Sequence, residues 1–248
     1  MLVEDVDFTA RDNPYLVGRK ALAVSMSDIA SCGGVPRYCV VSMGIPASLL
    51  AKYAERIFCG MHDLARNYHT NIVGGDLSRS RKIVIDVSML GLVRKKHLVL
   101  RSGAKPKDII FVTGALGGSI YGKHLRFTPR LEAAQYLVKN FKINAMIDIS
   151  DGLVQDLGHI LRQSNVGAVL FEKLIPLAKK ARGLDDSLFM GEDFELLFTA
   201  SPPQAKRLLA KAAKFIPIGQ TMESGYGLRL LGPDGNQRPI KKKGFCHF

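Results

Sequence analysis

The stretch "AMIDISDGLVQDLGHI", residues 145–160, carries the strongest structural signal in the chain. Residues 145–149 are mainly apolar, which is typical of a buried strand. After them, Leu153, Leu157, Ile160 and Leu161 recur at the spacing of one helical face. The stretch therefore predicts a strand that leads into a helix, which is the unit of α/β folds.

The same stretch contains three acids, Asp148, Asp151 and Asp156. Carboxylates in apolar surroundings are costly unless something neutralises them. In one interpretation Ser150 and Asp151 cap the helix, where the helix dipole favours negative charge. In the other, Asp148 and Asp151 hold a cation. Asp156 lies at the border of the apolar face, and we assign it a structural role.

Strand and helix patterns alternate along the rest of the chain. They predict helices at 13–34, 48–69, 129–139 and 203–214, and strands at 71–73, 82–93, 109–114, 191–200 and 225–231. We expect the strand at 82–93 to be buried and the strand at 71–73 to end in a "GGD" turn. The turn-rich loop "RSGAKPKD" (101–108) predicts two lobes, 1–100 and 101–248, in a fold of α/β plus α+β class.

Other acids lie beside glycine or serine at the ends of predicted elements. Asp28 lies close to the C-terminal end of a helix, where the dipole disfavours an anion, so it requires a cation more clearly than Asp151 does. Asp76 follows two glycines, and Glu192 and Asp193 follow another glycine. Each motif alone is commonly just a turn. Together they suit Mg²⁺, which takes a few carboxylates, waters and phosphate oxygens.

The composition narrows the class of protein. The chain has 248 residues, is 47% hydrophobic and carries a formal charge of +13, which indicates a globular protein open to acidic partners such as nucleotides. Acids interrupt the first ten residues, and the longest apolar stretch is too short to cross a membrane. Four cysteines form no C-x-x-C pair, so we expect reduced thiols and a cytoplasmic protein.

Three alternative chemistries lack support in the sequence. Residues 111–124 approach the Walker A spacing, but His124 stands where that motif requires Ser or Thr. No nucleophile motif is present, so we predict no catalytic side chain that forms a covalent intermediate. Basic residues are scattered without nucleic-acid motifs, so we expect neither nucleic-acid nor membrane partners.

Taken in order, the motifs resemble the thiamine-monophosphate kinase family, within the aminoimidazole ribonucleotide synthetase-like superfamily. The likeness runs from end to end, through "LVEDVDF" (2–8), "GRKALAVSMSDIASCGGVPR" (18–37), "VGGDLS" (73–78), "RSGAKPKDIIFVTG" (101–114), residues 145–160, "GEDFELLF" (191–198) and "KGFCHF" (243–248). The resemblance implies ATP-dependent phosphorylation of thiamine phosphate to thiamine diphosphate. It also implies a two-lobed fold whose N-terminal sheet lobe binds ATP and Mg²⁺ and forms a homodimer.

Motif matching implies a role for individual residues. The implied metal ligands, for several Mg²⁺ ions, are Asp28, Asp76, Asp148 and Asp151. The implied ATP contacts are Gly75, Arg101 and Ser150, and Glu192 is the implied contact to thiamine phosphate. The resemblance also implies direct in-line transfer without a phosphoenzyme, in which positioning and charge neutralisation carry the chemistry.

The chain also departs from the family pattern. It begins after a family segment that carries a Gly-Asp-Asp loop and a further Asp, so we expect a truncated N-terminal lobe with weakened Mg²⁺ and ATP binding. Asp7, Leu77 and Lys242 replace the family's His, Thr and aromatic residue. Two alternatives therefore stay open: another ATP-dependent superfamily enzyme acting on a ribonucleotide, and a non-catalytic relative that binds nucleotide.

Overall fold

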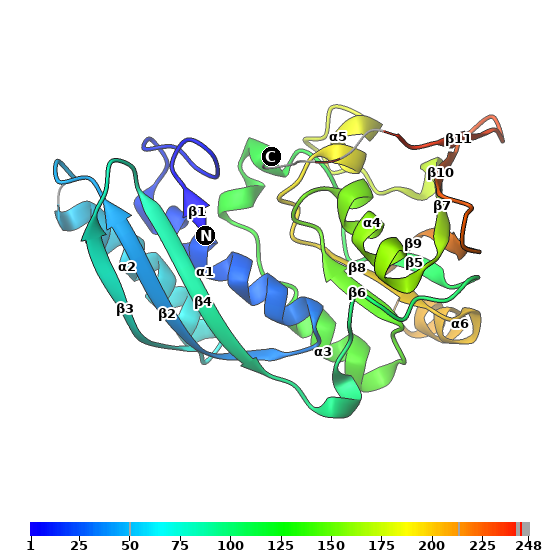
Figure 1. Ribbon diagram of the computed structural model, residues 1–248, viewed down its shortest axis with the longest axis horizontal. Helices are drawn as coiled ribbons and strands as arrows, with labels where there is room; N and C mark the ends of the chain where they lie inside the picture. The colour runs from blue at the N-terminus through cyan, green and yellow to red at the C-terminus, as the bar shows by residue number, and fades with distance from the viewer. Residues whose placement is uncertain (50, 213, 242–243, 245–248) are drawn as a thin grey trace.

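Two β-sheets lie side by side in the protein (Figure 1). The structure, a computed structural model, describes residues 1–49, 51–212, 214–241 and 244. Lys242 and most of the "KGFCHF" ending lie outside the described residues. Within the described part, no helix is long and apolar enough to span a membrane.

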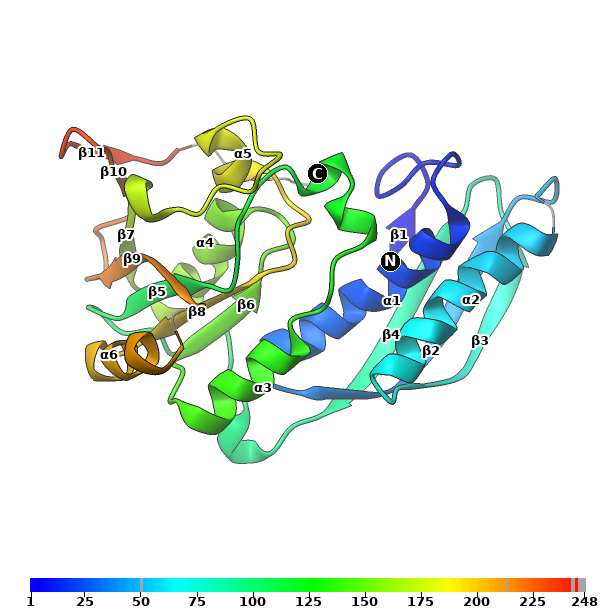
Figure 2. The ribbon, with the colours of Figure 1, turned by 180° about the vertical axis from the view of Figure 1, so that it is seen from behind.

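The first sheet has the strand order β1-β4-β2-β3. Its strands are β1 (Leu2–Val3), β2 (Val35–Ile45), β3 (Asn71–Arg79) and β4 (Val84–Leu92). Helices α1 (Pro14–Ser31) and α2 (Ala51–Asn67) cover one face of this sheet, and no helix of the described residues covers the other (Figure 2). Because side chains alternate along a strand, Cys39 and Val41 of β2 are buried on the helix side, whereas Tyr38 and Val40 are exposed on the open face.

Two glycines allow α1 and α2 to cross in close contact. A Cβ atom at Gly18 would lie 1.8 Å from the Ile57 carbonyl oxygen, and one at Gly60 would lie 1.9 Å from the Tyr15 carbonyl oxygen. Helix α1 starts as its sequence predicts: the Asn13 side chain accepts the N–H of Tyr15 at 3.0 Å, and proline occupies the first turn. The backbone contact between the helices leaves no room for a side chain at either glycine.

The second sheet has seven strands in the order β11-β10-β7-β9-β5-β8-β6. They are β5 (Ile109–Val112), β6 (Ala145–Asp148), β7 (Gly167–Phe171), β8 (Leu196–Ala200), β9 (Ile216–Met222), β10 (Leu228–Leu231) and β11 (Gln237–Pro239). Helix α4 (Leu153–Ser164) covers one face, and α3 (Leu131–Asn140) and α6 (Pro202–Lys211) cover the other (Figures 1 and 2). Shorter elements are α5 (Leu184–Phe189) and 3-10 turns at Lys95–His97, Ser119–Tyr121, Lys123–Leu125 and Glu172–Leu174.

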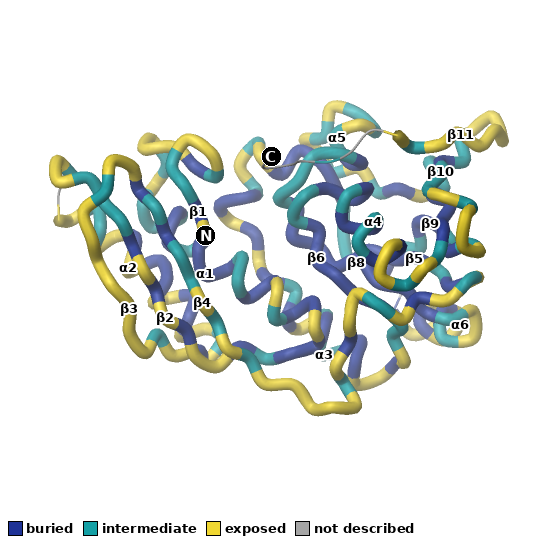
Figure 3. The backbone as a smooth tube through the Cα atoms, viewed as in Figure 1, coloured by how far each residue is buried: buried dark blue, intermediate teal, exposed yellow. Residues whose placement is uncertain are grey.

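The core runs through both sheets, as the buried segments in Figure 3 indicate. In β5, Ile110 and Val112 pack on the α4 side. Between them, Phe111 points to the other side, where it stacks on Phe198 with 5.2 Å between ring centroids. The apolar cluster on that other side, which contains Phe111 and Phe198, also includes Met26 of α1. Helix α1 therefore packs against both sheets.

The structure corrects three expectations from the sequence. No turn follows residue 73, because β3 continues through the two glycines to Arg79 as an edge strand. Strand β4 is not fully buried, since helices cover only one of its faces and Leu90 is 71% exposed on the other. Residues 191–195 are not a strand: the N–H groups of Glu192 and Phe194 bond to the carbonyls of Ser150 and Ile149 instead of a sheet ladder.

Candidate functional site

A cleft of about 670 Å³ lies between the lobes. Its walls come from the N-terminal segment, α1, the loop after β6, and the segment from α5 to residue 194. One part of the lining is acidic. Another part is apolar and includes Val24, Ile120, Phe189 and Phe194. The cleft therefore offers both hard oxygen donors and a surface for an organic ring.

Asp28 and Asp148 both belong to the acidic wall of the cleft. Asp148, at the end of β6, is buried and accepts a hydrogen bond from the Ser27 hydroxyl of α1 at 2.7 Å. Burial, together with the nearby charge of Asp28, raises the pKa of Asp148 to about 6. Asp28 is exposed within the cleft, yet desolvation by the surrounding walls still raises its pKa, against the charge of Arg101. The two carboxyls thus create a site that favours a cation or a proton.

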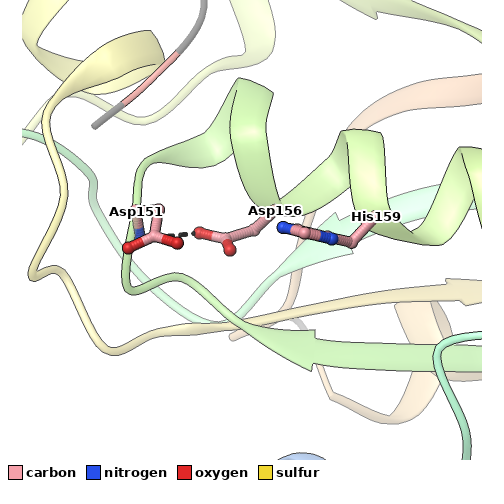
Figure 4. Close-up of side chains that lie close together, drawn as sticks. All are labelled: Asp151, Asp156 and His159. Carbon is pink, nitrogen blue, oxygen red and sulfur yellow. Dashed lines mark hydrogen bonds between the residues drawn. The ribbon is translucent and has the colours of Figure 1, made fainter. Parts of the chain in front are cut away.

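The loop between β6 and α4 presents Ser150 and Asp151 to the cleft. Gly152, at φ +109°, precedes α4, so neither Ser150 nor Asp151 is the N-cap, contrary to the capping interpretation. Instead, the buried Asp156 carboxylate accepts the N–H of Asp151 at 3.0 Å (Figure 4). The same loop requires a glycine at position 191, since a Cβ there would lie 2.3 Å from the Ser150 carbonyl oxygen. Asp156 is therefore structural, as expected, and fixes the loop that carries Asp151.

Asp151, Asp156 and His159 lie in a row along the start of α4 (Figure 4). One potential ligand atom from each lies within 4.8 Å of the others. Desolvation raises the pKa of Asp156 to about 8, and this carboxylate already holds the Asp151 backbone. Of the three, only Asp151 lines the cleft, so Asp156 and His159 lie behind it.

The predicted site residues divide into three groups. Asp28, Asp148, Ser150, Asp151 and Glu192 all line the one cleft, as the resemblance leads us to expect of a shared site. Arg101 does not line it, but its charge acts on both Asp28 and Asp148. Gly75 and Asp76 lie elsewhere within the single chain, on the exposed edge strand β3, where Asp76 accepts a hydrogen bond from Ser78 at 2.8 Å.

Sequence reasoning missed the polar network around Glu192. The Lys20 ammonium, completely buried, donates to the Asp7 carbonyl at 2.7 Å and to Glu192. His124 Nδ1 lies 3.0 Å from the other oxygen of the Glu192 carboxylate. A signal was present, because Lys20 falls at helical spacing with the buried residues Val17 and Ala23 of α1.

A second polar cluster, around the buried carboxylate of Glu195, was also missed. Both oxygens of Glu195 accept hydrogen bonds from Arg130, at 2.6 and 2.7 Å, and Lys123 is 2.9 Å away. The lysine of the Walker-like stretch is therefore paired with a carboxylate, and the segment after β5 forms 3-10 turns, not the helix that a P-loop requires. Asp193 accepts the N–H of Gly117 at 2.8 Å.

We expect Asp193→Asn to change how stability depends on pH. Desolvation raises the pKa of Asp193 to about 7, against the hydrogen bond from Gly117, so the folded state binds this proton more tightly than the unfolded chain. The protonated Asp193 carboxyl contributes fully to the free energy of unfolding below about pH 4, and this contribution is lost as pH rises through 7. The loss amounts to about 2–4 kcal/mol. Denaturant unfolding at several pH values should show the wild type losing that much relative to the variant. Parallel curves for the two proteins would contradict the prediction.

Comparisons with known proteins show which family the chain resembles. The family model for "AIR synthase related protein, N-terminal domain" matches residues 1–93, and that for the C-terminal domain matches residues 88–229. The thiamine-monophosphate kinase of Bacillus subtilis is 34% identical, in an alignment that covers 100% of this chain and 86% of that protein. The thiamine-monophosphate kinase of Aquifex aeolicus is 31% identical, with 100% and 86% covered.

Solved structures also align with the chain. The structure "AaThiL complexed with AMPPCP and TMP" aligns with a TM-score of 0.88 at 31% identity and covers 100% of this chain and 85% of that one. The hydrogenase maturation protein HypE in complex with ATP aligns with a TM-score of 0.79 at 20% identity, which supports the shared fold alone.

Proposed function

The chain belongs to the thiamine-monophosphate kinase family, and we propose that it transfers the terminal phosphoryl group of ATP to thiamine monophosphate, forming thiamine diphosphate. One observation carries the proposal: Asp28, Asp148, Asp151 and Glu192, from distant parts of the chain, line one cleft. A similar structure is described as a complex with AMPPCP and TMP, an ATP analogue and the substrate.

We assign Mg²⁺ binding to Asp28, Asp148 and Asp151. The residues fit this ion, because they offer hard carboxylate oxygens from two lobes. In addition, the raised pKa values of Asp28 and Asp148 mean that a cation would relieve the cost of ionising both. When bound, the ions supply charge neutralisation for the phosphate oxygens of ATP.

The residues of the chain then act by positioning. Ser150 lies on a loop fixed by Asp156 and Gly152, where it can contact ATP, and the charge of Arg101 reaches the same acidic wall. The apolar lining offers a surface to the organic ring of the acceptor. Direct in-line transfer needs no side-chain nucleophile, which agrees with the absence of such a motif from the sequence.

We further propose a homodimer formed through the open face of the first sheet. Tyr38, Val40, Leu90 and Leu92 expose an apolar surface there, between 43% and 71% exposed, which is typical of an interaction site. Asp76 pairs with Ser42 of β2 and lies on this same face. Its role as a metal ligand, the contact of Gly75 with ATP, the lobe boundary at 100/101 and the cytoplasmic location remain predictions.

Leu90→Lys should convert the dimer to a monomer. The charge would be placed in the centre of the apolar face, where pairing would leave it desolvated without a partner. Sedimentation velocity should show a decrease from twice the chain mass to 27.2 kDa. Leu209→Lys, on the exposed side of α6, is the matched control and should leave the mass unchanged. A Leu90→Lys protein that stays dimeric would exclude this face as the interface.

The function itself is tested by product analysis. The purified chain, with ATP and Mg²⁺, should convert thiamine monophosphate to thiamine diphosphate with equimolar ADP, and a chelator should abolish the reaction. ADP formation with a ribonucleotide but not with thiamine monophosphate would favour the alternative superfamily enzyme. Heat from binding an ATP analogue without any turnover would favour the non-catalytic relative.

A further inference from the structure

Lys20 is a buried cation at the junction of three segments. Its side chain has no exposure, and a buried ammonium is tolerated only when it is paired and hydrogen-bonded. Its Nζ donates to the Asp7 carbonyl in the N-terminal segment and to Glu192 in the second lobe. Its third contact is His124 Nδ1, at 3.1 Å, in the glycine-rich segment after β5. Two of its N–H groups thus have an acceptor, while the third lies beside His124 Nδ1, which carries the proton that it donates to Glu192.

Glu192 is held on both its backbone and its side chain. Its N–H donates to the Ser150 carbonyl at 2.7 Å, and its φ of +66° is in the left-handed region, which few side chains adopt. Lys20 contacts one carboxylate oxygen and His124 Nδ1 lies 3.0 Å from the other. The carboxylate is 24% exposed and lines the cleft, so its remaining lone pairs are available to a ligand.

The network also favours the ionised form of Glu192. Burial alone would raise the pKa of this carboxyl, but the hydrogen bond from His124 and the charge of Lys20 outweigh burial and lower it. The aromatic side chains of Phe189 and Phe194 line the same cleft. A fixed anion beside an apolar wall suits a ring that carries positive charge, as the thiazolium ring of thiamine does.

We infer that Lys20 and His124 are positioning residues that fix the Glu192 carboxylate in the orientation required to bind the cationic ring of the substrate. The inference rests on the proposed function, in which Glu192 contacts thiamine monophosphate. Lys20 does not touch the substrate. It acts through Glu192, and it links substrate binding to the contact between α1 and the second lobe.

The first test separates substrate binding from catalysis. Lys20→Met keeps an unbranched side chain, one atom shorter, and removes its charge. We expect KM for thiamine monophosphate to rise about tenfold or more, with KM for ATP within about twofold of wild type. Lys123→Met removes another lysine–glutamate pair, the one at Glu195, and is the matched control that should leave KM for thiamine monophosphate near wild type. In a Glu192→Gln background, Lys20→Met should add little further loss.

Two variants of His124 test the inference even if Lys20→Met does not fold. His124→Leu removes the ring nitrogen near Glu192 and should raise the same KM, whereas His124→Asn places an amide N–H near the position of Nδ1 and should restore much of the affinity. A purely structural role would give both variants similar kinetics.

A third measurement does not depend on activity. Carbon-13 NMR titration of the Glu192 carboxyl, assigned with Glu192→Gln, should show a higher pKa in Lys20→Met than in wild type. If wild type lacks kinase activity but this shift occurs, the proposed function fails and the positioning role stands. If Lys20→Met matches Lys123→Met in KM and in the Glu192 titration, the inference is overturned.

Discussion

Asp148→Asn is expected to reduce turnover by about 10²–10³-fold at saturating substrates, the size of loss seen when a preorganised electrostatic group is removed from an active site. The amide keeps an oxygen that can accept the Ser27 hydrogen bond, so the local packing is preserved. What it removes is the negative charge that faces Asp28 and, in the proposed function, a Mg²⁺ ligand. Steady-state kinetics over a range of Mg²⁺ concentrations measures the effect.

The same substitution should stabilise the metal-free protein. The pKa of Asp148 in the fold, about 6, is above the ordinary value of 3.8, so the fold retains this proton more tightly than the unfolded chain does. Its contribution to stability is complete below about pH 4 and is lost as pH rises through 6. Near pH 8 the wild type therefore carries a cost of about 1–3 kcal/mol that the amide avoids. Added Mg²⁺ should remove this advantage, because only the wild type binds the ion fully.

Asp108→Asn provides the control. Asp108 is also buried in the second lobe, where it accepts the Lys105 N–H at 3.0 Å and the Asn144 amide at 2.8 Å, away from the cleft. This variant should lose about 1–3 kcal/mol of stability and keep its response to Mg²⁺. If Asp148→Asn keeps wild-type turnover, or is no more stable than wild type without Mg²⁺, the acidic wall is not a metal site.

Gly18→Val is expected to destabilise the fold by about 3 kcal/mol or more, because the contact is with backbone and cannot be relieved by moving a side chain. The two helices would have to separate and lose the packing that covers the first sheet. For a chain of this length the midpoint of thermal unfolding should decrease by about 10 °C.

Gly158→Ala is the matched control for Gly18→Val. Gly158 also lies within a helix, but a Cβ there meets only the Arg162 guanidinium, at 3.3 Å. Since alanine is the better helix former, this change should be neutral or stabilising by up to about 1 kcal/mol. Equal destabilisation by both substitutions would show that helix propensity, not the crossing of α1 and α2, sets the cost.

Much of the fold is predictable from local signals. The spacing of Leu153, Leu157 and Ile160 correctly predicts α4, and the cap at Asn13 correctly predicts the start of α1. Burial is harder to predict, since it depends on which face a distant helix covers. Leu90 belongs to a strand of apolar appearance and is nevertheless exposed. The residues near Glu192 resemble a strand, but their bonds are to the loop at 149–150 and not to a ladder.

The candidate site, too, was predictable from the sequence only in part. The acids at element ends attract attention individually, and the family resemblance supplies the expectation that Asp28, Asp148 and Asp151 meet. Lys20 and His124 were missed because their partner, Glu192, is remote in sequence: helical spacing indicates that Lys20 is buried but not which carboxylate it pairs with. The role of Asp76 as a metal ligand stays a prediction, because this residue lies, in a single chain, on the exposed edge strand β3 and away from the cleft.

Helix α1 belongs by sequence to the first lobe, yet its side chains reach the second at several points. The Arg19 guanidinium donates to the Phe127 carbonyl, Lys20 binds Glu192, and Ser27 donates to Asp148. A fragment that begins at the turn-rich loop near residue 101 would thus expose the apolar surface that α1 covers and would lose these bonds. A chimera that exchanges second lobes between relatives must therefore transfer α1 together with the lobe that it contacts.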